Sequence, residues 1–381
     1  MSDKEVKMRN ALDRLTIKGF KSIRTLEDFR LKNLNVLIGA NGAGKTNFID
    51  FFRLLRAMME LSLPGLSHAS LQSFIRNLGG IDDFLFNGPK ITQEIETKLH
   101  FGANGYGFRL APTADEAVLI NDEKIYDKHS ESVWHRIGSG YFRPGLLNEK
   151  ETMCVSTEHN VCRCIYETIN CWRIYHFHDT GKTASLRRSE ITEDCDFLRS
   201  DAANVAPFLL RLHEEKPAFY HEIIEAVRLV TPFFDDFILK PDKNEKVRLI
   251  WRQKGSDYPM RPHLFSDGTL RFICLAAALL QPDPPATMIV DEPELGLHPY
   301  AIGILAELIE AASEKTQVIV STQSPALVDY FNPEDIVVVV RNNGASEFRR
   351  LNAKELSHWL DQYSLGDLWR KNVISGGPVH E

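Results

Sequence analysis

The sequence contains no apolar run long enough to cross a membrane. Its longest uninterrupted apolar stretch, residues 272–280, is far shorter than the roughly 20 residues that a membrane-spanning helix needs. The N-terminal residues also lack the apolar core of a secretion signal. We therefore expect a protein of the cytoplasm, rather than a membrane or secreted protein.

Cysteine is scarce, with six residues scattered through a chain of 381. Such a sequence does not predict the disulfide framework of small secreted domains, and we expect reduced thiols. Four cysteines gather near one histidine: Cys154, His159, Cys162, Cys164 and Cys171. No two of these cysteines have the two-residue or four-residue spacing typical of structural zinc sites, so we interpret them as strand and core residues.

Positive charge is not in excess. The formal net charge is −7 and the sequence pI is about 6.0, whereas nucleic-acid-binding domains usually carry a basic face. Lysine and arginine cluster only locally, around residues 182–188 and 349–354. Composition therefore does not favour a DNA-binding function, although it leaves room for a local basic groove.

The first two thirds of the chain change pattern twice. The length of 381 residues predicts about two or three domains, and a hydrophobic fraction of 43% is enough for sizeable buried cores. Apolar patterns predict strands over 15–17 and 34–38 and a helix over 47–61. Short alternating or aromatic runs over 92–173 predict an antiparallel β lobe. Its strands include 107–110 and 161–166, and it is followed by helices within 197–230 and a strand over 247–251.

The last third has the alternating pattern of an α/β protein. The expected helices are 269–280, 300–312 and 325–330, and the expected strands are 287–290, 317–321 and 336–340. Strands that alternate with helices predict a mainly parallel sheet covered on both faces. Asn343 and Gly344 then predict a hairpin. We expect an α/β fold whose core is split between residues 1–90 and 261–381, with β and helical lobes inserted over 91–260.

The strongest motif is the stretch over residues 39–46, which matches the Walker A pattern in full. It lies between a predicted strand and a predicted helix, where glycines let backbone N–H groups surround phosphates at a helix N-terminus. Lys45 should reach the β- and γ-phosphates of ATP, and the Thr46 hydroxyl should bind Mg²⁺. The motif therefore predicts an ATP site.

A carboxylate pair follows a second apolar strand. Asp291 stands at the expected carboxyl end of the strand over 287–290, where α/β sheets bind ligands, and can hold Mg²⁺ in the Walker B role. Glu292 is placed to orient or deprotonate the attacking water. Paired with the Walker A motif, this run is strong evidence for nucleotide hydrolysis.

A capped helix start precedes that strand by about twenty residues. Ser266 or Asp267 suits the N-cap, and Gly268 permits close approach of a ligand to the backbone. The order of Walker A, this helix start and Walker B is the arrangement of the ABC signature. In that arrangement the helix N-terminus faces the γ-phosphate held by the opposite protomer.

A fourth motif, residues 321–325, follows the next expected strand. ABC ATPases usually place a histidine there to sense the γ-phosphate, and this chain has Gln323. A neutral amide can bind a phosphate oxygen or water but cannot carry a proton's charge. We therefore hypothesise slow or partner-dependent hydrolysis.

With these four motifs, the chain resembles the AAA-type ATPases that have an ABC head, the broad group that contains RecF, SMC and the ATPase half of OLD-family proteins. The resemblance covers nearly the whole chain. It includes further segments at residues 78–86, 175–180, 201–204 and 355–369, the last of which is typical of stand-alone prokaryotic members.

The resemblance implies ATP and Mg²⁺ as cofactors and a specific set of site residues. Glu292, Lys45 and Gln323 would be catalytic, and Thr46 and Asp291 would bind the metal. The nucleotide would be held by Asn41, Gly42, Ala43, Gly44, Lys45, Thr46, Asn47 and Lys21, with Ser266 and Gly268. Gln72 is a weaker candidate for the Q-loop glutamine.

The segment over residues 175–179 allows a competing interpretation. His176, His178 and Asp179 could form a metal or nuclease site, because alternate residues of a strand point the same way. No third ligand cluster is evident, so we favour a strand of the β lobe with partly buried aromatic residues. OLD proteins carry a Toprim nuclease after the ATPase, and we expect any nuclease or effector here to be a separate protein.

Together these patterns predict an ATPase that closes as a head-to-head homodimer around Mg-ATP. Its output would be linked to double-stranded DNA or to a separate effector, in DNA repair or antiviral defence. A slowly hydrolysing ATP-bound scaffold for an effector stays open because of Gln323. The signature residues, Gln323 and the long insertion disfavour an ABC transporter subunit, which would also need a membrane partner.

Overall fold

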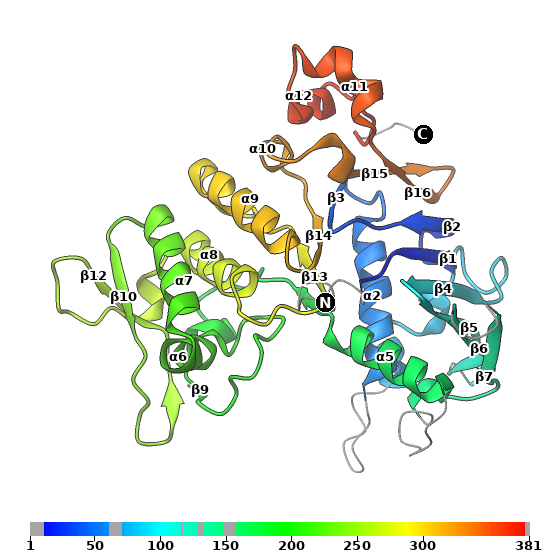
Figure 1. The fold of residues 1–381 in the computed structure, drawn as a ribbon, viewed down its shortest axis with the longest axis horizontal. Coiled ribbons are helices and arrows are strands. Elements are labelled where there is room, and N and C mark those ends of the chain that lie inside the picture. The colour runs from blue at the N-terminus through cyan, green and yellow to red at the C-terminus, as the bar shows by residue number, and fades with distance from the viewer. Residues whose placement is uncertain (1–10, 61–70, 116, 129–132, 148–156, 378–381) are drawn as a thin grey trace.

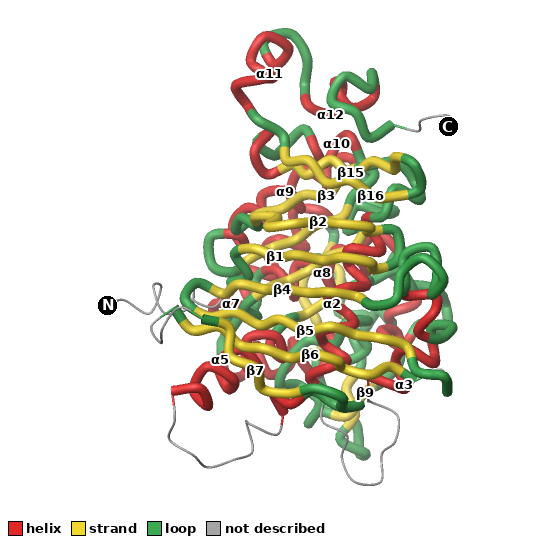
Figure 2. The backbone as a smooth tube through the Cα atoms, turned by 90° about the vertical axis from the view of Figure 1, so that its right-hand side faces the viewer, coloured by secondary structure: helices red, strands yellow, loops and turns green. Residues whose placement is uncertain are grey.

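The structure, a computed structural model, describes residues 11–60, 71–115, 117–128, 133–147 and 157–377. Within these residues two six-stranded sheets organise the chain, one largely parallel and one antiparallel (Figures 1 and 2). Of the cysteine and histidine group considered above, Cys154 and the side chain of His159 lie outside the described part.

The parallel sheet has the strand order β16-β15-β3-β14-β13-β8. Its strands are β3 (Leu34–Ile38), β8 (Arg173–Tyr175), β13 (Thr287–Asp291), β14 (Gln317–Ser321), β15 (Ile336–Asn342) and β16 (Ala345–Arg350). All neighbours pair in parallel except the hairpin of β15 and β16. Apolar residues of β3 alternate between two cores, with Val36 in one and Leu37 in the other, as expected for a sheet covered on both faces.

The antiparallel sheet has the order β2-β1-β4-β5-β6-β7. Its strands are β1 (Arg14–Phe20), β2 (Ile23–Arg30), β4 (Ile95–Phe101), β5 (Asn104–Pro112), β6 (Val118–Asp127) and β7 (Trp134–Gly138). It therefore takes two strands from before residue 91 and is not confined to the expected insertion. The sequence patterns did not identify β2, because a bulge in its pairing with β1, near Asp28 with a φ of 47°, breaks its alternation.

Two long helices, α2 (Lys45–Met59) and α5 (Thr157–Cys171), pack against the antiparallel sheet. The hydrophobic core between them also includes residues from one face of the parallel sheet. The short helix α3 (Leu71–Asn77) contributes to the same core. The expectation of a strand over 161–166 was wrong, because these residues lie in α5. The buried residues repeat at helical spacing rather than in alternation: Val161, Cys162, Ile165, Tyr166 and Ile169.

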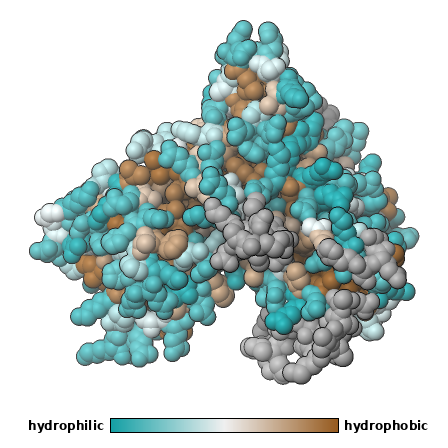
Figure 3. Space-filling model, viewed as in Figure 1, coloured by the Kyte–Doolittle hydropathy of each residue, from teal (hydrophilic) through white to brown (hydrophobic). Residues whose placement is uncertain are grey.

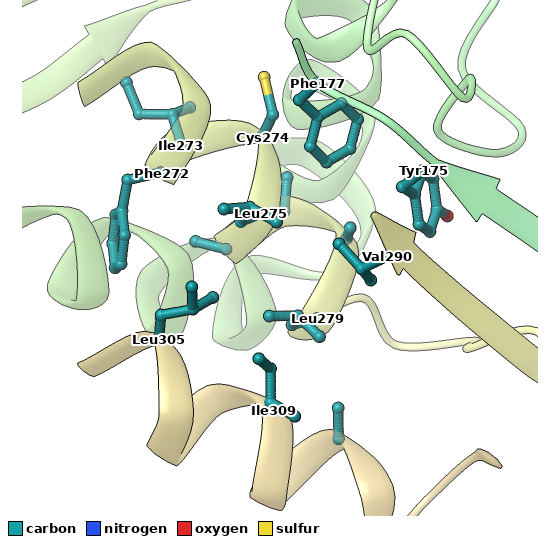
Figure 4. Close-up of a cluster of buried hydrophobic side chains, with 14 of the residues drawn as sticks. Tyr175, Phe177, Phe272, Ile273, Cys274, Leu275, Leu279, Val290, Leu305 and Ile309 are labelled. Atoms are coloured by element: carbon teal, nitrogen blue, oxygen red, sulfur yellow. The ribbon is translucent and has the colours of Figure 1, made fainter. Parts of the chain in front are cut away.

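A helical lobe covers the other face of the parallel sheet. It contains α6 (Val205–Glu215), α7 (Pro217–Val230), α8 (Asp267–Leu279) and α9 (Pro299–Ser313), with the short strand pairs β10 (Phe234–Ile238) with β12 (Ile250–Gln253) and β9 (Glu190–Ile191) with β11 (Lys246–Val247). In Figure 4 the α8 side chains Leu275 and Leu279 lie among Val290 of β13 and Leu305 and Ile309 of α9. The outer face in Figure 3 is mainly hydrophilic.

Three short helices complete the chain beside β15: α10 (Pro325–Val328), α11 (Ala353–Leu360) and α12 (Leu365–Arg370). They form the top of the molecule in Figure 1. Among the helices that the structure describes, none has the length and apolarity to span a bilayer.

The antiparallel sheet contains one fully buried carboxylate, and we predict that Glu123→Gln lowers the free energy of unfolding by about 1–3 kcal/mol. Glu123 accepts hydrogen bonds from the Tyr106 hydroxyl (2.7 Å), the Gly145 N–H (2.6 Å) and the Leu146 N–H (3.1 Å). A glutamine would turn its amide N–H₂ towards one of these donors and leave that donor unsatisfied. Urea unfolding of both proteins measures the difference.

The control is Glu94→Gln, which removes an exposed carboxylate with a surface ion pair. It should change the free energy of unfolding by less than about 0.5 kcal/mol. Equal losses in the two variants would contradict a special role of the buried carboxylate.

Candidate functional site

The predicted phosphate-binding loop joins β3 to α2, and backbone conformation or close packing requires glycine at positions 39, 42 and 44. Gly42 and Gly44 have φ values of 77° and 114°, in the region that side chains disfavour. A Cβ atom on Gly44 would lie 2.0 Å from the Ser346 hydroxyl oxygen, and one on Gly39 would lie 2.2 Å from the Val339 carbonyl oxygen. The loop opens the N-terminus of α2, where the helix dipole favours an anion.

A chain of hydrogen bonds fixes this loop from the side of β16. The Ser346 hydroxyl donates to the Ala43 carbonyl oxygen over 2.6 Å, so the Ser22 hydroxyl is the donor in its own 2.6 Å contact with Ser346. The Asn47 amide donates to Ser22 over 2.6 Å. Asn47, expected beside the nucleotide, therefore also holds the loop in place.

The two lysines expected at the nucleotide differ in their partners. Lys45 is 5% exposed, and its Nζ donates to the Gly39 carbonyl oxygen (2.6 Å). Burial lowers the pKa of Lys45, and the charge of Glu292 opposes this shift. Lys21 instead forms an ion pair with Asp50 on α2, with 2.7 Å between Nζ and Oδ2. The structure thus directs Lys45 into the loop and Lys21 towards α2.

The carboxylates and the switch glutamine meet where adjacent strands end. Parallel pairing places Asp291 opposite Ser321. Glu292 has a φ of 46°, and its N–H donates to the Ser321 carbonyl oxygen over 2.8 Å. The Gln323 amide donates to the Glu292 carboxylate. Burial raises the pKa of Asp291, because a partly buried carboxylate loses hydration that stabilises its charged form.

Glu294 is a site residue that the sequence reasoning did not single out. Its carboxylate accepts hydrogen bonds from the Thr322 hydroxyl (2.6 Å) and the Gln323 N–H (3.0 Å). Burial raises the pKa of Glu294. Glu294 therefore holds the loop of Gln323 against the Walker B segment.

His178 was placed wrongly. Residues 173–175 form β8 at the edge of the parallel sheet, beside β13, and the residues after them are a loop rather than a strand of the antiparallel lobe. The His178 Nε2 lies 3.1 Å from the Asp291 carbonyl oxygen, and it carries the proton because a carbonyl only accepts. Within the described residues no group of three or more His, Cys, Asp or Glu side chains is arranged to hold a metal.

Gln72 lies in α3 and is engaged in the antiparallel lobe. Its side chain donates to the Val118 carbonyl oxygen over 2.7 Å and accepts from the Val118 N–H over 3.0 Å. Both ends of the amide are thus used to hold the start of β6. The loop after β8 instead places His178, and not Gln72, beside Asp291.

The predicted signature helix begins where expected, but in the helical lobe. Ser266 caps α8 by accepting from the Thr269 N–H over 3.1 Å. A Cβ atom on Gly268 would lie 2.4 Å from the Gly296 carbonyl oxygen, so the helix start packs directly on the loop that follows Walker B. In the described part of the chain no hydrogen bond joins Ser266 to residues 39–47, and α8 lies on the other side of the parallel sheet from α2 (Figure 1).

One arginine ties this helix to the catalytic edge. The Arg271 guanidinium donates to the carbonyl oxygens of Leu295, Phe177 and His178, the last two over 2.8 and 3.1 Å. It therefore joins α8 to the loop after β13 and to the loop after β8. A movement of either loop would move the signature helix.

The side chains present fit Mg-ATP. The loop over 39–46 offers a glycine cradle with open space at Gly42, since a Cβ atom there would meet no atom within 4 Å. Thr46 is exposed at the end of the loop, and Asp291 provides a carboxylate. A hydroxyl and a carboxylate are the hard oxygen ligands that Mg²⁺ prefers alongside phosphate oxygens.

The fold is that of an ABC-type ATPase head, and its structural neighbours include SMC heads. The chain is similar to a solved Smc head bound to the C-winged-helix domain of ScpA, with 17% identity, a TM-score of 0.56, and 91% of this chain and 99% of that chain covered. It is also similar to a Smc head with an extended coiled coil bound to the C-terminal domain of ScpA, derived from Pyrococcus furiosus. There the identity is 15%, the TM-score 0.54 and the coverage 92% and 99%.

The chain belongs to the family described as AAA domain, putative AbiEii toxin, Type IV TA system, whose model matches residues 34–142 and 168–329. No curated protein has a significant sequence match. The AAA family and the ATPase head fold together suggest that the chain binds and hydrolyses ATP.

We predict that Gly268→Ala lowers the free energy of unfolding by about 1–3 kcal/mol, because its Cβ would collide with the backbone at Gly296. Thermal and urea unfolding measure the loss. Gly181→Ala is the matched control, since its Cβ would meet only the Asp179 side chain at an ordinary 3.4 Å. A variant at 268 as stable as the control would show that the close packing is not required.

Proposed function

We propose that this chain is an ATPase that binds Mg-ATP between two copies of itself and uses hydrolysis to control their association. One observation carries the proposal. The loops that follow three adjacent strands bring together Lys45, Asp291, Glu292 and Gln323, whereas the signature helix α8 begins in the helical lobe. The nucleotide site and the signature therefore need a second copy to complete each other.

Each residue of the catalytic edge has a distinct role in this proposal. Lys45 and the loop glycines bind the phosphates, with Asn41 and Gly42 at the exposed tip of the loop. Thr46 and Asp291 would hold Mg²⁺, which supplies charge neutralisation of the phosphates when bound. Glu292 accepts a proton from the attacking water.

Gln323 and His178 position the groups around that water. The Gln323 amide, through its hydrogen bond to Glu292, orients the carboxylate. The His178 ring, through its hydrogen bond to the Asp291 backbone, fixes the end of β13. These contacts restrict the geometry of the general base before the nucleotide closes the site.

The second copy would supply Ser266 and Gly268. Ser266 is exposed at the first turn of α8, where the helix N-terminus can stabilise a γ-phosphate bound to the other protomer. Two such sites form symmetrically in a head-to-head homodimer, so that ATP joins the heads and hydrolysis releases them.

The output of this cycle would be an effector-linked or DNA-linked process in the cytoplasm, in DNA repair or antiviral defence. The family description names a putative toxin, and the similar Smc heads are bound to another protein, ScpA. These findings support a separate effector protein as the partner. Double-stranded DNA is the second partner class, and a salt-sensitive stimulation of turnover by linear duplex DNA would distinguish it.

A slowly hydrolysing scaffold is the second candidate function. The observation that favours it is the direct hydrogen bond between Gln323 and Glu292, which uses a neutral amide where a histidine could accept a proton. In this case ATP would hold two copies and an effector together for long periods, with turnover as a rare release event.

We predict that Glu292→Gln lowers the rate of ATP hydrolysis by about 10²- to 10⁴-fold, because the general base is lost. ATP binding should persist, and the ATP-dependent dimer should live longer. Phosphate release measures the rate, and light scattering coupled to size exclusion measures the mass with and without ATP.

The exposed Glu307→Gln serves as the control for the loss of one negative charge on α9, and it should change neither quantity. A Glu292→Gln protein that hydrolyses ATP at the wild-type rate would refute the catalytic assignment. A wild-type rate already close to that of Glu292→Gln, combined with a stable ATP-dependent dimer, would select the scaffold.

A further inference from the structure

The C-terminal segment lines a cleft beside the phosphate-binding loop. A cleft of about 440 Å³ lies in front of the phosphate-binding loop. Its lining residues come from two parts of the chain. The first part is the loop residues 39–41 together with Gln323 and Pro325, and the second part follows the last of the four ATPase motifs: Trp369, Arg370, Asn372, Gly376 and Gly377.

Helix α12 is packed directly on the helix that follows the switch glutamine. A Cβ atom on Gly366 would lie 2.4 Å from the Pro325 carbonyl oxygen, and the Gly366 N–H donates to Asp329 over 2.6 Å. The Leu365–Arg370 helix therefore has a fixed position relative to the start of α10, only two residues after Gln323.

The end of the segment is packed on the phosphate-binding loop itself. Gly376 has a φ of 88°, and a Cβ atom there would lie 3.0 Å from the Val338 side chain and 3.6 Å from the Gly39 Cα atom. The Arg349 guanidinium donates to the Ile374 carbonyl oxygen over 2.9 Å. The segment is thus anchored at both ends, and Arg370 lies between the anchors.

Arg370 brings a positive charge to a cleft whose switch residue is neutral. Its side chain is 56% exposed, and its partner is Asp367, one turn earlier in the same helix, at 3.0 Å. Such an exposed pair is weak and can open or be shared with a ligand. The planar donors of a guanidinium match phosphate oxygens in pairs.

We propose that Arg370 contacts the terminal phosphate of ATP and supplies the positive charge that Gln323 lacks. This inference rests on the proposed function, because it assumes that ATP occupies the loop over 39–46. Arg370 then distinguishes ATP from ADP, since only ATP carries the third phosphate that Arg370 would contact. The C-terminal segment becomes a nucleotide-contacting element, and Arg370 a residue for ATP specificity.

The neighbouring lysine provides a matched control. Lys371 carries the same charge one position later, but its ammonium lies over the Tyr363 ring, 4.1 Å from the centroid, and it is not among the residues that line the cleft. Arg370→Gln and Lys371→Gln thus change net charge equally and differ in the position of the lost charge.

The test measures the Kd values of ATP and ADP by titration calorimetry, in the full chain with Glu292→Gln present to prevent turnover. Arg370→Gln should weaken ATP binding by about 10- to 100-fold, as expected for loss of a hydrogen bond to a charged group. Its ADP affinity should stay within about twofold, which also verifies the fold. Arg370→Lys should retain part of the ATP preference, and Lys371→Gln should retain all of it.

An unchanged ratio of ATP to ADP affinity in Arg370→Gln would overturn the inference, as would equal losses in Arg370→Gln and Lys371→Gln. The failure of the proposed function looks different. In that case the parent protein with intact Arg370 would bind neither nucleotide, or Lys45→Ala would bind ATP as well as the parent does.

Discussion

The parallel pairing of β3, β14 and β13 is the constraint on which the rest of the structure depends. It sets Leu37 beside Ser321 and Ser321 beside Asp291, so that the loops after three strands open at one edge. The ammonium group of Lys45 and the carboxylate of Asp291, each costly to bury alone, are then buried near each other. Burial lowers the pKa of Lys45 and raises that of Asp291, and the carboxylate charges oppose the shift at Lys45.

The loops at this edge of the sheet also contact two other elements of the fold, the start of α8 and the C-terminal segment. Arg271 joins the signature helix to the loops that follow β13 and β8, and Gly268 packs without space against Gly296. On the opposite side, the C-terminal segment touches both Gly39 and the helix after Gln323. The start of α8 and the C-terminal segment are therefore both held in place by direct contacts with loops of the candidate site.

The sequence predicted those features that depend on local chemistry. The loop over 39–46, the carboxylates Asp291 and Glu292 and the capped start of α8 follow from residue types at fixed spacing, and the class of fold follows from alternating strands and helices.

Features set by long-range pairing were not predictable. β8 has only three residues, and its place beside β13 depends on a partner more than a hundred residues away, so His178 was assigned to the wrong sheet. The run over 161–166 is compatible with a short strand as well as with a helix. In the structure it forms part of helix α5, whose buried residues repeat at helical spacing. Nothing local in the sequence indicated that the C-terminal glycines pack on the phosphate-binding loop.

The central claim is that each ATP site is completed by the other copy, and a mixing experiment tests it most directly. Lys45→Ala should disable the phosphate-binding loop, and Ser266→Arg should disable the signature, so each protein alone should be inactive. In an equal mixture about half of the dimers contain one of each, and each of these has one intact site of two. The account predicts recovery of about a quarter of the wild-type rate of ATP hydrolysis, if subunits exchange freely. Full activity of Ser266→Arg alone, or no recovery when mixed dimers are demonstrably formed, would contradict it.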